Sequence, residues 1–405
     1  MNELAGSPQA PGVAQGSAGE APRPLSRRAN LMPRSAIREI MSLAAGRPDV
    51  IHLEVGEPDF GTPAHIVDQA FSAVRSGATR YTGNAGRSSL RAAIAARASR
   101  SGIPVAPERV IVTVGAIGAL FTALMSLIDP GDEVLIPDPG WPNYESIVVL
   151  AGGVPVRYAL HESACFLPDP DALLAQVTLR TKAILVNSPG NPTGAVFPTD
   201  MVARIGAIAA SRGVYLISDE IYEDIVFSAA RHETFLRHTP QDRLFVISGA
   251  SKSYAMTGWR LGWLICPREA AAVAEKLQEP IVSCAPAPSQ AAAEAALLGP
   301  QDAVEDGRRL FERRRDAFVE IIGPTGMMAS HPQGAFYGLV KLPNAEPNAL
   351  EFARRLLLDQ GVAVVPGDTF GPSTARMIRL AFTIEDERLR EGLRRIARHI
   401  AGNAA

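Results

Sequence analysis

A lysine and an arginine eight residues apart are the most chemically suggestive pair in this sequence. Lys252 and Arg260 lie in SKSYAMTGWRLGW at 251–263, just after the apolar run 244–247, which has the pattern of a buried strand. A lysine in an apolar pocket loses its proton more easily and can attack a carbonyl carbon, while a nearby arginine can hold a phosphate. The pair predicts a pyridoxal phosphate (PLP) site, with Lys252 in a Schiff base and Arg260 on the phosphate. The alternative is a surface lysine on a loop.

Two other strand ends supply groups that suit the PLP ring. Asp219 follows the apolar run 214–218, and the carboxyl end of a buried parallel strand faces the crevice where α/β proteins bind ligands. There Asp219 can keep the pyridine nitrogen protonated, while Tyr222 reaches the phenolic oxygen. Asn191, in the rigid loop 188–194, can bond the same oxygen. The alternatives are a helix N-cap for Asp219 and an ordinary tight turn for the loop.

Two weaker signals fit the same cofactor. At 112–120 a strand runs into a small-residue turn and then a helix. Free N–H groups at a helix N-terminus bind phosphate, although close strand–helix turns also favour glycine and alanine for packing alone. Trp141 follows the apolar run 133–137. It could stack on a flat ring, or it could be a core tryptophan.

Taken in order, these segments resemble the fold-type-I, class I/II (aspartate aminotransferase-like) family of PLP-dependent aminotransferases, from about residue 30 to the end. The matching segments are LEVGEPDF at 53–60, YTGNAG at 81–86 with Leu90 and Arg91 after it, GAI at 115–117, Trp141, NPTG at 191–194, DEIY at 219–222, Ser251-Lys252 with Arg260, and MIRLAF at 377–382. The resemblance implies an α/β fold. A large PLP-binding domain is built on a mostly parallel sheet, and a smaller α+β domain is built from the N-terminal segment and the C-terminal region.

The resemblance also implies a role for each matching residue. Lys252, Asp219 and Tyr222 would be catalytic: the Schiff-base lysine and proton carrier, the partner of the pyridinium, and a donor to the phenolic oxygen. Arg379 would pair with the substrate α-carboxylate, a geometry that arginine suits. The remaining roles are phosphate binding by Gly115, Ala116, Ile117, Ser251 and Arg260, ring and substrate contacts by Trp141 and Asn191, closure over the carboxylate by Gly56, and contact with the partner subunit's phosphate by Tyr81.

Three positions depart from the family pattern. Gly249 stands where a phosphate-binding serine is common, so Ser251 compensates or the phosphate has one contact fewer. Ser188 replaces the first asparagine of the usual Asn-Pro-x-Asn-Pro-Thr-Gly pattern. Ile117 stands where some aspartate-using relatives have a lysine for the distal carboxylate. Since isoleucine cannot pair with a carboxylate, we expect a neutral or apolar amino acid as substrate, with glutamate and 2-oxoglutarate as partner. Candidates for the side-chain pocket, each of which could equally be packing, are Phe60, Asn84, Ile117 and Phe370.

The predicted activity is a ping-pong transfer of an amino group between an L-amino acid and a 2-oxo acid. A PLP-dependent β-lyase (C–S lyase) or a related eliminating enzyme is the alternative within the same cofactor class, because pocket shape decides which group leaves. A second alternative is a non-catalytic PLP-fold regulator fused to a DNA-binding module. The N-terminus is too short and not basic enough for such a module.

Composition bounds the remaining possibilities. The chain has 405 residues, 47% of them hydrophobic, and a formal net charge of −2, which argues against a nucleic-acid-binding surface or a polybasic membrane patch. Cys165, Cys266 and Cys284 have neither disulfide-framework nor zinc-site spacing. With no membrane-spanning run and no signal-peptide core, we expect a cytoplasmic enzyme. The family resemblance adds a homodimer with shared active sites.

The chain divides into four predicted parts. Residues 1–28 form a disordered tail rich in small residues, and 29–62 pack with the small domain. Strands and helices alternate over 63–285, the large PLP-binding domain, and 286–405 form the small domain. Within the small domain the patterns predict helices at 286–298, 301–322 and 385–400, and strands at 334–341, 361–366 and 376–382.

Overall fold

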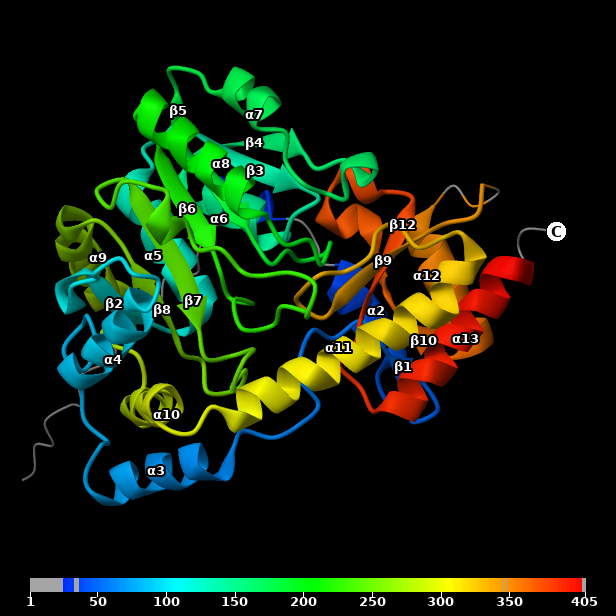
Figure 1. Ribbon diagram of the computed structural model, residues 1–405, viewed down its shortest axis with the longest axis horizontal. Helices are drawn as coiled ribbons and strands as arrows, with labels where there is room; N and C mark the ends of the chain where they lie inside the picture. The colour runs from blue at the N-terminus through cyan, green and yellow to red at the C-terminus, as the bar shows by residue number, and fades with distance from the viewer. Residues whose placement is uncertain (1–24, 33–35, 345, 347, 403–405) are drawn as a thin grey trace, which may run out of the picture. The chain divides into compact units, whose positions relative to one another are not determined.

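A seven-stranded sheet carries the loops that the sequence singles out (Figure 1). In the computed structural model, which describes residues 25–32, 36–344, 346 and 348–402, its order is β2-β8-β7-β6-β5-β3-β4. Its strands are β2 Val110–Thr113, β3 Glu133–Asp138, β4 Val154–Ala159, β5 Thr181–Asn187, β6 Tyr215–Asp219, β7 Leu244–Gly249 and β8 Gly262–Ile265. Five neighbouring strands, from β4 to β7, run parallel. Only β8 is antiparallel to its neighbours, so the predicted mostly parallel sheet is confirmed.

The sheet is buried on both faces because its strands are apolar at successive positions. In β5, Ala183 and Leu185 enter the core on one face, whereas Ile184 and Val186 enter the core on the other. The first face is covered by helices α5 Gly115–Leu127, α6 Asn143–Ala151 and α9 Arg268–Val282. The other core is completed by α3 Ala64–Arg75, α4 Ser88–Ser99, α7 Pro170–Gln176, α8 Thr199–Arg212 and α10 Ala287–Leu298.

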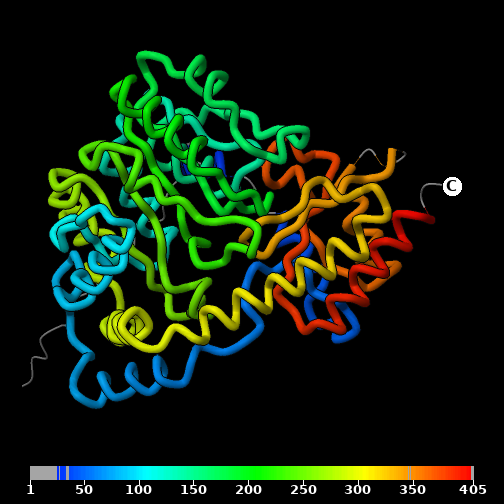
Figure 2. The backbone as a smooth tube through the Cα atoms, viewed as in Figure 1, coloured from blue at the N-terminus to red at the C-terminus, as the bar shows by residue number. Residues whose placement is uncertain are grey.

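A second hydrophobic core is built from both ends of the described chain. Strand β1 (Ile51–His52) pairs in parallel with β10 (Val362–Ala363), and Figure 2 shows this N-terminal segment running among the C-terminal elements. Around them lie the antiparallel sheet β11-β12-β9, with β9 Tyr337–Lys341, β11 Val365–Pro366 and β12 Met377–Ala381, and the helices α2 Ala36–Ala44, α11 Asp302–Ile322, α12 Ala349–Gln360 and α13 Asp386–Gly402. This is the smaller α+β part that the sequence predicts.

Several expected elements differ from the observed ones. The predicted strand 361–366 is two strands with different partners, since β10 pairs with β1 whereas β11 pairs with β12. Strand β8 is missing from the sequence-based expectations because its glycine and tryptophan resemble a loop. It is a strand because Trp263 and Leu264 enter opposite cores of the sheet. Short 3₁₀ helices occupy Pro107–Arg109, Glu162–Ala164, Phe235–Arg237, Gly323–Thr325, Gly367–Phe370 and Pro372–Thr374.

The domain boundaries stay a prediction. Residues 33–405 form one compact unit, and α10, expected in the small domain, contributes Ala292 and Ala293 to a core of the large sheet. The predicted disordered tail lies mostly outside the described residues, and its last two residues begin the short helix α1 (Arg27–Asn30). No helix within the described ranges combines the length and apolarity needed to cross a bilayer.

Leu53 should be a sensitive test of the junction between the two ends of the chain. Its side chain is fully buried, its N–H donates to the Ala363 carbonyl, and its own carbonyl accepts from the Ala381 N–H. We expect Leu53→Ala to lower the free energy of unfolding by roughly 2–5 kcal/mol, because it leaves a cavity in a packed core. Urea unfolding measures this. Leu358→Ala, at an exposed position, is the control and should change stability by less than about 0.5 kcal/mol.

Candidate active site

A cavity of about 550 Å³ lies where the carboxyl ends of the parallel strands meet the second core. The predicted site residues that line it are Gly56, Ala116, Ile117, Trp141, Asn191, Asp219, Tyr222, Ser251, Lys252, Arg260 and Arg379. Gly115 begins α5 beside Arg260. Tyr81 is 87% exposed and is not part of the lining, so its predicted contact with a partner subunit stays a prediction. The structure thus brings together nearly all of the residues chosen from sequence.

The lysine lies on the connection between β7 and β8. Its Nζ donates a hydrogen bond of 2.7 Å to the Gly56 carbonyl. Burial, with smaller contributions from the charges of Arg379 and Arg260, lowers the pKa of Lys252 to about 8 against the opposing charge of Glu57. The amine is therefore much closer to its neutral, nucleophilic form at neutral pH than a solvated lysine is.

Asp219, at the end of β6, is the buried carboxylate of the cavity. It is 5% exposed and accepts hydrogen bonds from the Tyr144 hydroxyl at 2.7 Å and the Ile221 N–H at 3.2 Å. Burial raises the pKa of Asp219 to about 6, although both hydrogen bonds oppose the rise. A cationic ring nitrogen beside it would restore the charged form, so this carboxylate suits a pyridinium.

Arg379, on β12, is 3% exposed and holds the opposite side of the cavity. Its Nη2 donates to the Glu54 carbonyl at 2.5 Å and its Nη1 to Asn191 Oδ1 at 3.4 Å, while its Nε is buried with no hydrogen-bond partner among the described residues. Burial lowers the pKa of the guanidinium. An arginine with an unmet donor in a cavity suits an anionic acceptor such as a carboxylate.

The start of α5 offers a place for a phosphate. The N-cap residue Val114 makes no side-chain cap hydrogen bond, so the first N–H groups of the helix lack that partner. Gly115 has a φ of +71°, and a Cβ there would lie 2.6 Å from Arg260 Nη2. Gly262 is equally constrained, because a Cβ would overlap the Ala116 backbone nitrogen. Gly115 thus lets Arg260 approach the helix N-terminus, and Gly262 lets β8 pack closely against it. A guanidinium beside free helix N–H groups suits a phosphate.

The departures from the family pattern have local explanations. Gly249 pairs with Gly262 across β7 and β8, and a Cβ at 249 would lie 3.0 Å from the Gly262 Cα, so the site has little room for a larger residue. Ser188 is used structurally, because its Oγ accepts the Phe197 N–H at 2.9 Å. Ser251 is buried and lines the cavity, which leaves it available as the compensating phosphate contact.

The expected side-chain pocket is only partly observed. Ile117 lines the cavity. Phe60 packs against Phe311, with ring centroids 5.7 Å apart, so it belongs to packing. Phe370 lies under the Arg379 guanidinium at 5.1 Å, and Asn84 is not part of the lining.

Sequence reasoning missed several groups. Tyr144 and Tyr337 line the cavity, as do Ile37, Arg38 and Met41 of α2. Asn187 connects two strand ends, since its Nδ2 donates to the Asp219 carbonyl at 3.0 Å and its Oδ1 accepts from the Asn191 N–H at 2.8 Å. The position of Tyr144, three residues after Trp141 at a helix start, was a local signal. Tyr337 and α2 approach through tertiary packing, which no local pattern reveals.

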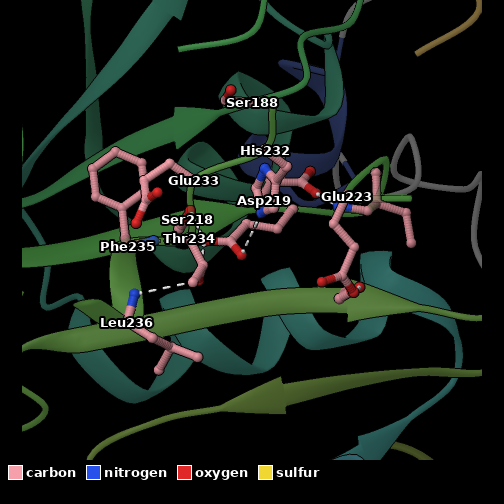
Figure 3. Close-up of polar contacts among 12 residues, drawn as sticks. Ser188, Ser218, Asp219, Glu223, His232, Glu233, Thr234, Phe235 and Leu236 are labelled. Atoms are coloured by element: carbon pink, nitrogen blue, oxygen red, sulfur yellow. Dashed lines mark hydrogen bonds and ion pairs between the residues drawn. The ribbon is translucent and has the colours of Figure 1, made fainter. Parts of the chain in front are cut away.

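A second cavity, about 430 Å³, holds a buried charge network next to Asp219 in the chain (Figure 3). Ligand atoms of Glu220, Glu223 and His232 lie within 4.8 Å of one another, close enough to suggest a metal site. However, Glu223 already pairs with Arg97 at 3.3 Å, and Glu220 accepts from Ser218, Thr234 and Phe235 and pairs with His232 at 3.1 Å. We therefore assign these residues to bracing the segment after β6.

The protonation of His232 fits this assignment. Burial opposes the charged form of the imidazole, but the hydrogen bond and charge of Glu220 outweigh burial, so the pKa of His232 is raised. This shift favours the charged imidazole, whose charge, like that of Arg97, offsets the neighbouring carboxylates.

Comparison with known proteins identifies the family. The sequence matches the family model "aminotransferase class I and II" over residues 48–396. The chain belongs to this family. Over 384 residues it is 38% identical to the aspartate/prephenate aminotransferase of Thermus thermophilus, covering 93% of this chain and 98% of that protein. It is also 37% identical over 391 residues to the aspartate aminotransferase of Geobacillus stearothermophilus, covering 93% and 98%.

Solved structures agree with the family assignment. The aspartate aminotransferase of T. thermophilus with maleate superposes with a TM-score of 0.89 at 37% identity, covering 93% of this chain and all of that one (100%). The aromatic aminotransferase of Pyrococcus horikoshii gives a TM-score of 0.85 at 34% identity, covering 90% and 99%. This aminotransferase is therefore a transaminase of a PLP-enzyme family with fold type I, and the β-lyase alternative is not favoured.

The lowered pKa of Lys252 can be measured on the cofactor-free protein. Only the neutral amine reacts with an acylating reagent, so we expect labelling of Lys252 to rise with a midpoint near pH 8, rather than at the roughly 10.4 of a solvated lysine. Mass spectrometry of digested protein gives the labelling rate against pH, with the exposed Lys276 as the internal control for the reagent. A midpoint near that of a solvated lysine would contradict the assigned environment.

Proposed function

We propose that this aminotransferase uses PLP bound through Lys252 to move an amino group between an L-amino acid and a 2-oxo acid. The observation that supports it most is the convergence, in one cavity, of a lysine with a lowered pKa, a buried carboxylate and a buried arginine with an unmet donor. The reaction needs all three of these side chains, because each would have a different task. The lysine binds the cofactor, Asp219 keeps its ring charged and Arg379 orients the substrate.

Each residue then has a defined task. Arg379 binds the substrate α-carboxylate and so directs the Cα–H bond towards Lys252. The Nζ of Lys252, as a neutral amine, would remove the proton from Cα and carry it to the acceptor atom of the bound group. When bound, PLP supplies the sink for the electron pair of the broken bond. Arg260 and the N-terminus of α5 would hold the phosphate, Trp141 would cover the ring, and Asn191 and Tyr222 would bond the phenolic oxygen.

The apolar lining supports a neutral or apolar amino acid as donor, with glutamate and 2-oxoglutarate as the partner pair. Ile117 is 36% exposed and lines the cavity, and Ile37 and Met41 of α2 add two more apolar side chains. An apolar wall stabilises an apolar substrate side chain by removing it from water, and it penalises a carboxylate that finds no partner. The relative named as an aromatic aminotransferase is consistent with this choice.

Aspartate is the second candidate donor. Arg38 also lines the cavity, and a guanidinium can bind a distal carboxylate. The relatives named as aspartate or aspartate/prephenate aminotransferases favour the same substrate. A homodimer that shares its active sites, with Tyr81 reaching the partner's phosphate, and a cytoplasmic location complete the proposal as predictions.

A spectral titration with single amino acids tests the function directly. We expect the visible band of the PLP-loaded protein to convert to a pyridoxamine spectrum with glutamate and with apolar amino acids, without any acceptor present. Lys252→Ala should fold but lose transamination by more than about 10³-fold, because it removes both the attachment point and the proton carrier. Release of ammonia with bleaching of the band, or near wild-type turnover by Lys252→Ala, would overturn the proposal.

Substitution of Ile117 separates the two donor candidates. Ile117→Lys places a cation where an aspartate side chain would end, so we expect kcat/KM for aspartate, relative to an apolar donor, to rise roughly 3- to 10-fold, the effect of about 1 kcal/mol from a partly desolvated ion pair. Ile117→Met is the uncharged control and should leave the ratio near that of wild type. A wild-type preference for aspartate that Ile117→Lys does not increase would instead favour Arg38 as the distal partner.

A further inference from the structure

Tyr337 is a buried tyrosine that lines the cavity and touches two of its functional side chains. It begins β9, is 2% exposed and lines the cavity. Its hydroxyl lies 2.9 Å from the hydroxyl of Tyr222. It also lies so close to Gly56 that a Cβ there would overlap the Tyr337 oxygen. The chain therefore makes room for this hydroxyl by using a glycine.

The ring of Tyr337 has a second contact. The guanidinium carbon of Arg379 lies 4.5 Å from its centroid, which is within cation–π distance. One side chain thus contacts both Tyr222, proposed to bond the cofactor's phenolic oxygen, and Arg379, proposed to bind the substrate carboxylate.

The direction of the tyrosine pair follows from counting hydrogens. A hydroxyl has one hydrogen to donate. If Tyr222 donates its hydrogen to the phenolic oxygen, the bond between the two hydroxyls can form only when Tyr337 donates to Tyr222. Burial keeps water from replacing either partner.

We propose that Tyr337 is a positioning residue for this transamination: its hydroxyl orients Tyr222 towards the cofactor's phenolic oxygen, and its ring holds Arg379 in place for the substrate carboxylate. The proposal rests on the proposed function. The charged and titratable groups that face Tyr337 are Arg379 and Tyr222, and Lys252 and Asp219 line the same cavity.

Of the groups around Tyr337, the Arg379 charge favours donation by the hydroxyl, whereas burial works against it. Burial raises the pKa of Tyr337, and the positive charge of Arg379 opposes that rise. The guanidinium polarises the O–H bond, which strengthens the hydrogen bond to Tyr222. A carboxylate on Arg379 offsets part of this charge, so substrate binding and the basicity of the phenolic oxygen are linked through Tyr337.

The test follows the visible band of the PLP-loaded protein against pH, which reports the protonation of the lysine–cofactor linkage. With Tyr337→Phe the phenolic oxygen loses part of its hydrogen bonding and holds the shared proton more tightly. We expect the midpoint of this pH titration to rise by about 0.5 pH unit, because the free energy involved is a fraction of that of one hydrogen bond. Tyr222→Phe should raise the midpoint further. Adding Tyr337→Phe to Tyr222→Phe should not shift it again, because without the Tyr222 hydroxyl the Tyr337 hydroxyl has no group through which to act on the phenolic oxygen.

The matched control is Tyr158→Phe. Tyr158 is also buried, and its hydroxyl donates to the Leu185 carbonyl at 2.8 Å, but it is not part of the cavity lining. Its substitution should cost stability without moving the midpoint. Two results would contradict the role of the Tyr337 hydroxyl while leaving the proposed function intact. One is an unchanged midpoint of the pH titration in Tyr337→Phe, and the other is an equal shift when Tyr337→Phe is added to Tyr222→Phe. A wild-type protein with no visible band would instead overturn the proposed function.

The role of the ring is tested with 3-phenylpropionate as an unreactive carboxylate probe. Tyr337→Phe keeps the aromatic face under Arg379, so the dissociation constant of the probe should change less than about 2-fold. Tyr337→Leu removes the face and should weaken binding roughly 3- to 30-fold, the range of a partly to fully desolvated cation–π contact. If both variants bound 3-phenylpropionate equally tightly, the Tyr337 ring would have no part in holding Arg379 for the substrate carboxylate. If Tyr337→Leu fails to fold, the Tyr337→Phe pH titration still decides the hydroxyl's role.

Discussion

Burial of the Arg379 guanidinium is the constraint on which the rest of the cavity depends. A buried cation is costly unless hydrogen bonds or opposite charge compensate it. Within the described ranges no carboxylate makes an ion pair with Arg379. Its direct contacts are neutral, from the Glu54 carbonyl, Asn191 Oδ1 and the rings of Tyr337 and Phe370, and the charge of Glu54 also favours the guanidinium without a direct ion pair. Burial is the main cause of the lowered pKa of Lys252, and the same arginine adds to it, so the Arg379 charge would contribute both to substrate binding and to the reactive amine.

The backbone of the N-terminal segment supplies much of this compensation. Three consecutive carbonyls accept from three side chains: Glu54 from Arg379, Val55 from Thr383 and Gly56 from Lys252. The segment is fixed in turn by β1, which pairs with β10, and by Leu53. The site is thus assembled only when residues about 300 positions apart in the chain come together.

Local patterns were sufficient for the parts of the site that follow strands. Asp219 could be found because it ends an apolar run that forms a parallel strand, and Asn191 because it lies in the rigid loop that follows another such strand. The seven-stranded sheet then brings these ends to one edge. Tyr337 could not be found in this way, since its partners Tyr222 and Arg379 lie far from it in the sequence and meet it only in the second core. The three carbonyl acceptors were equally invisible, because backbone groups carry no residue-specific signal.

The two cores hold different halves of the chemistry. Lys252, Asp219 and Asn191 follow strands of the large sheet, and Arg260 lies on the same β7–β8 connection as Lys252. Arg379, Tyr337 and the α2 residues that line the cavity come from the second core or its edge. Apart from Ile117 on α5, the residues proposed to set substrate preference therefore lie in one part of the molecule, and they can change while the part that would grip the cofactor stays unchanged. Such a separation makes a chain like this easy to diversify, because new specificities arise without rebuilding the chemistry.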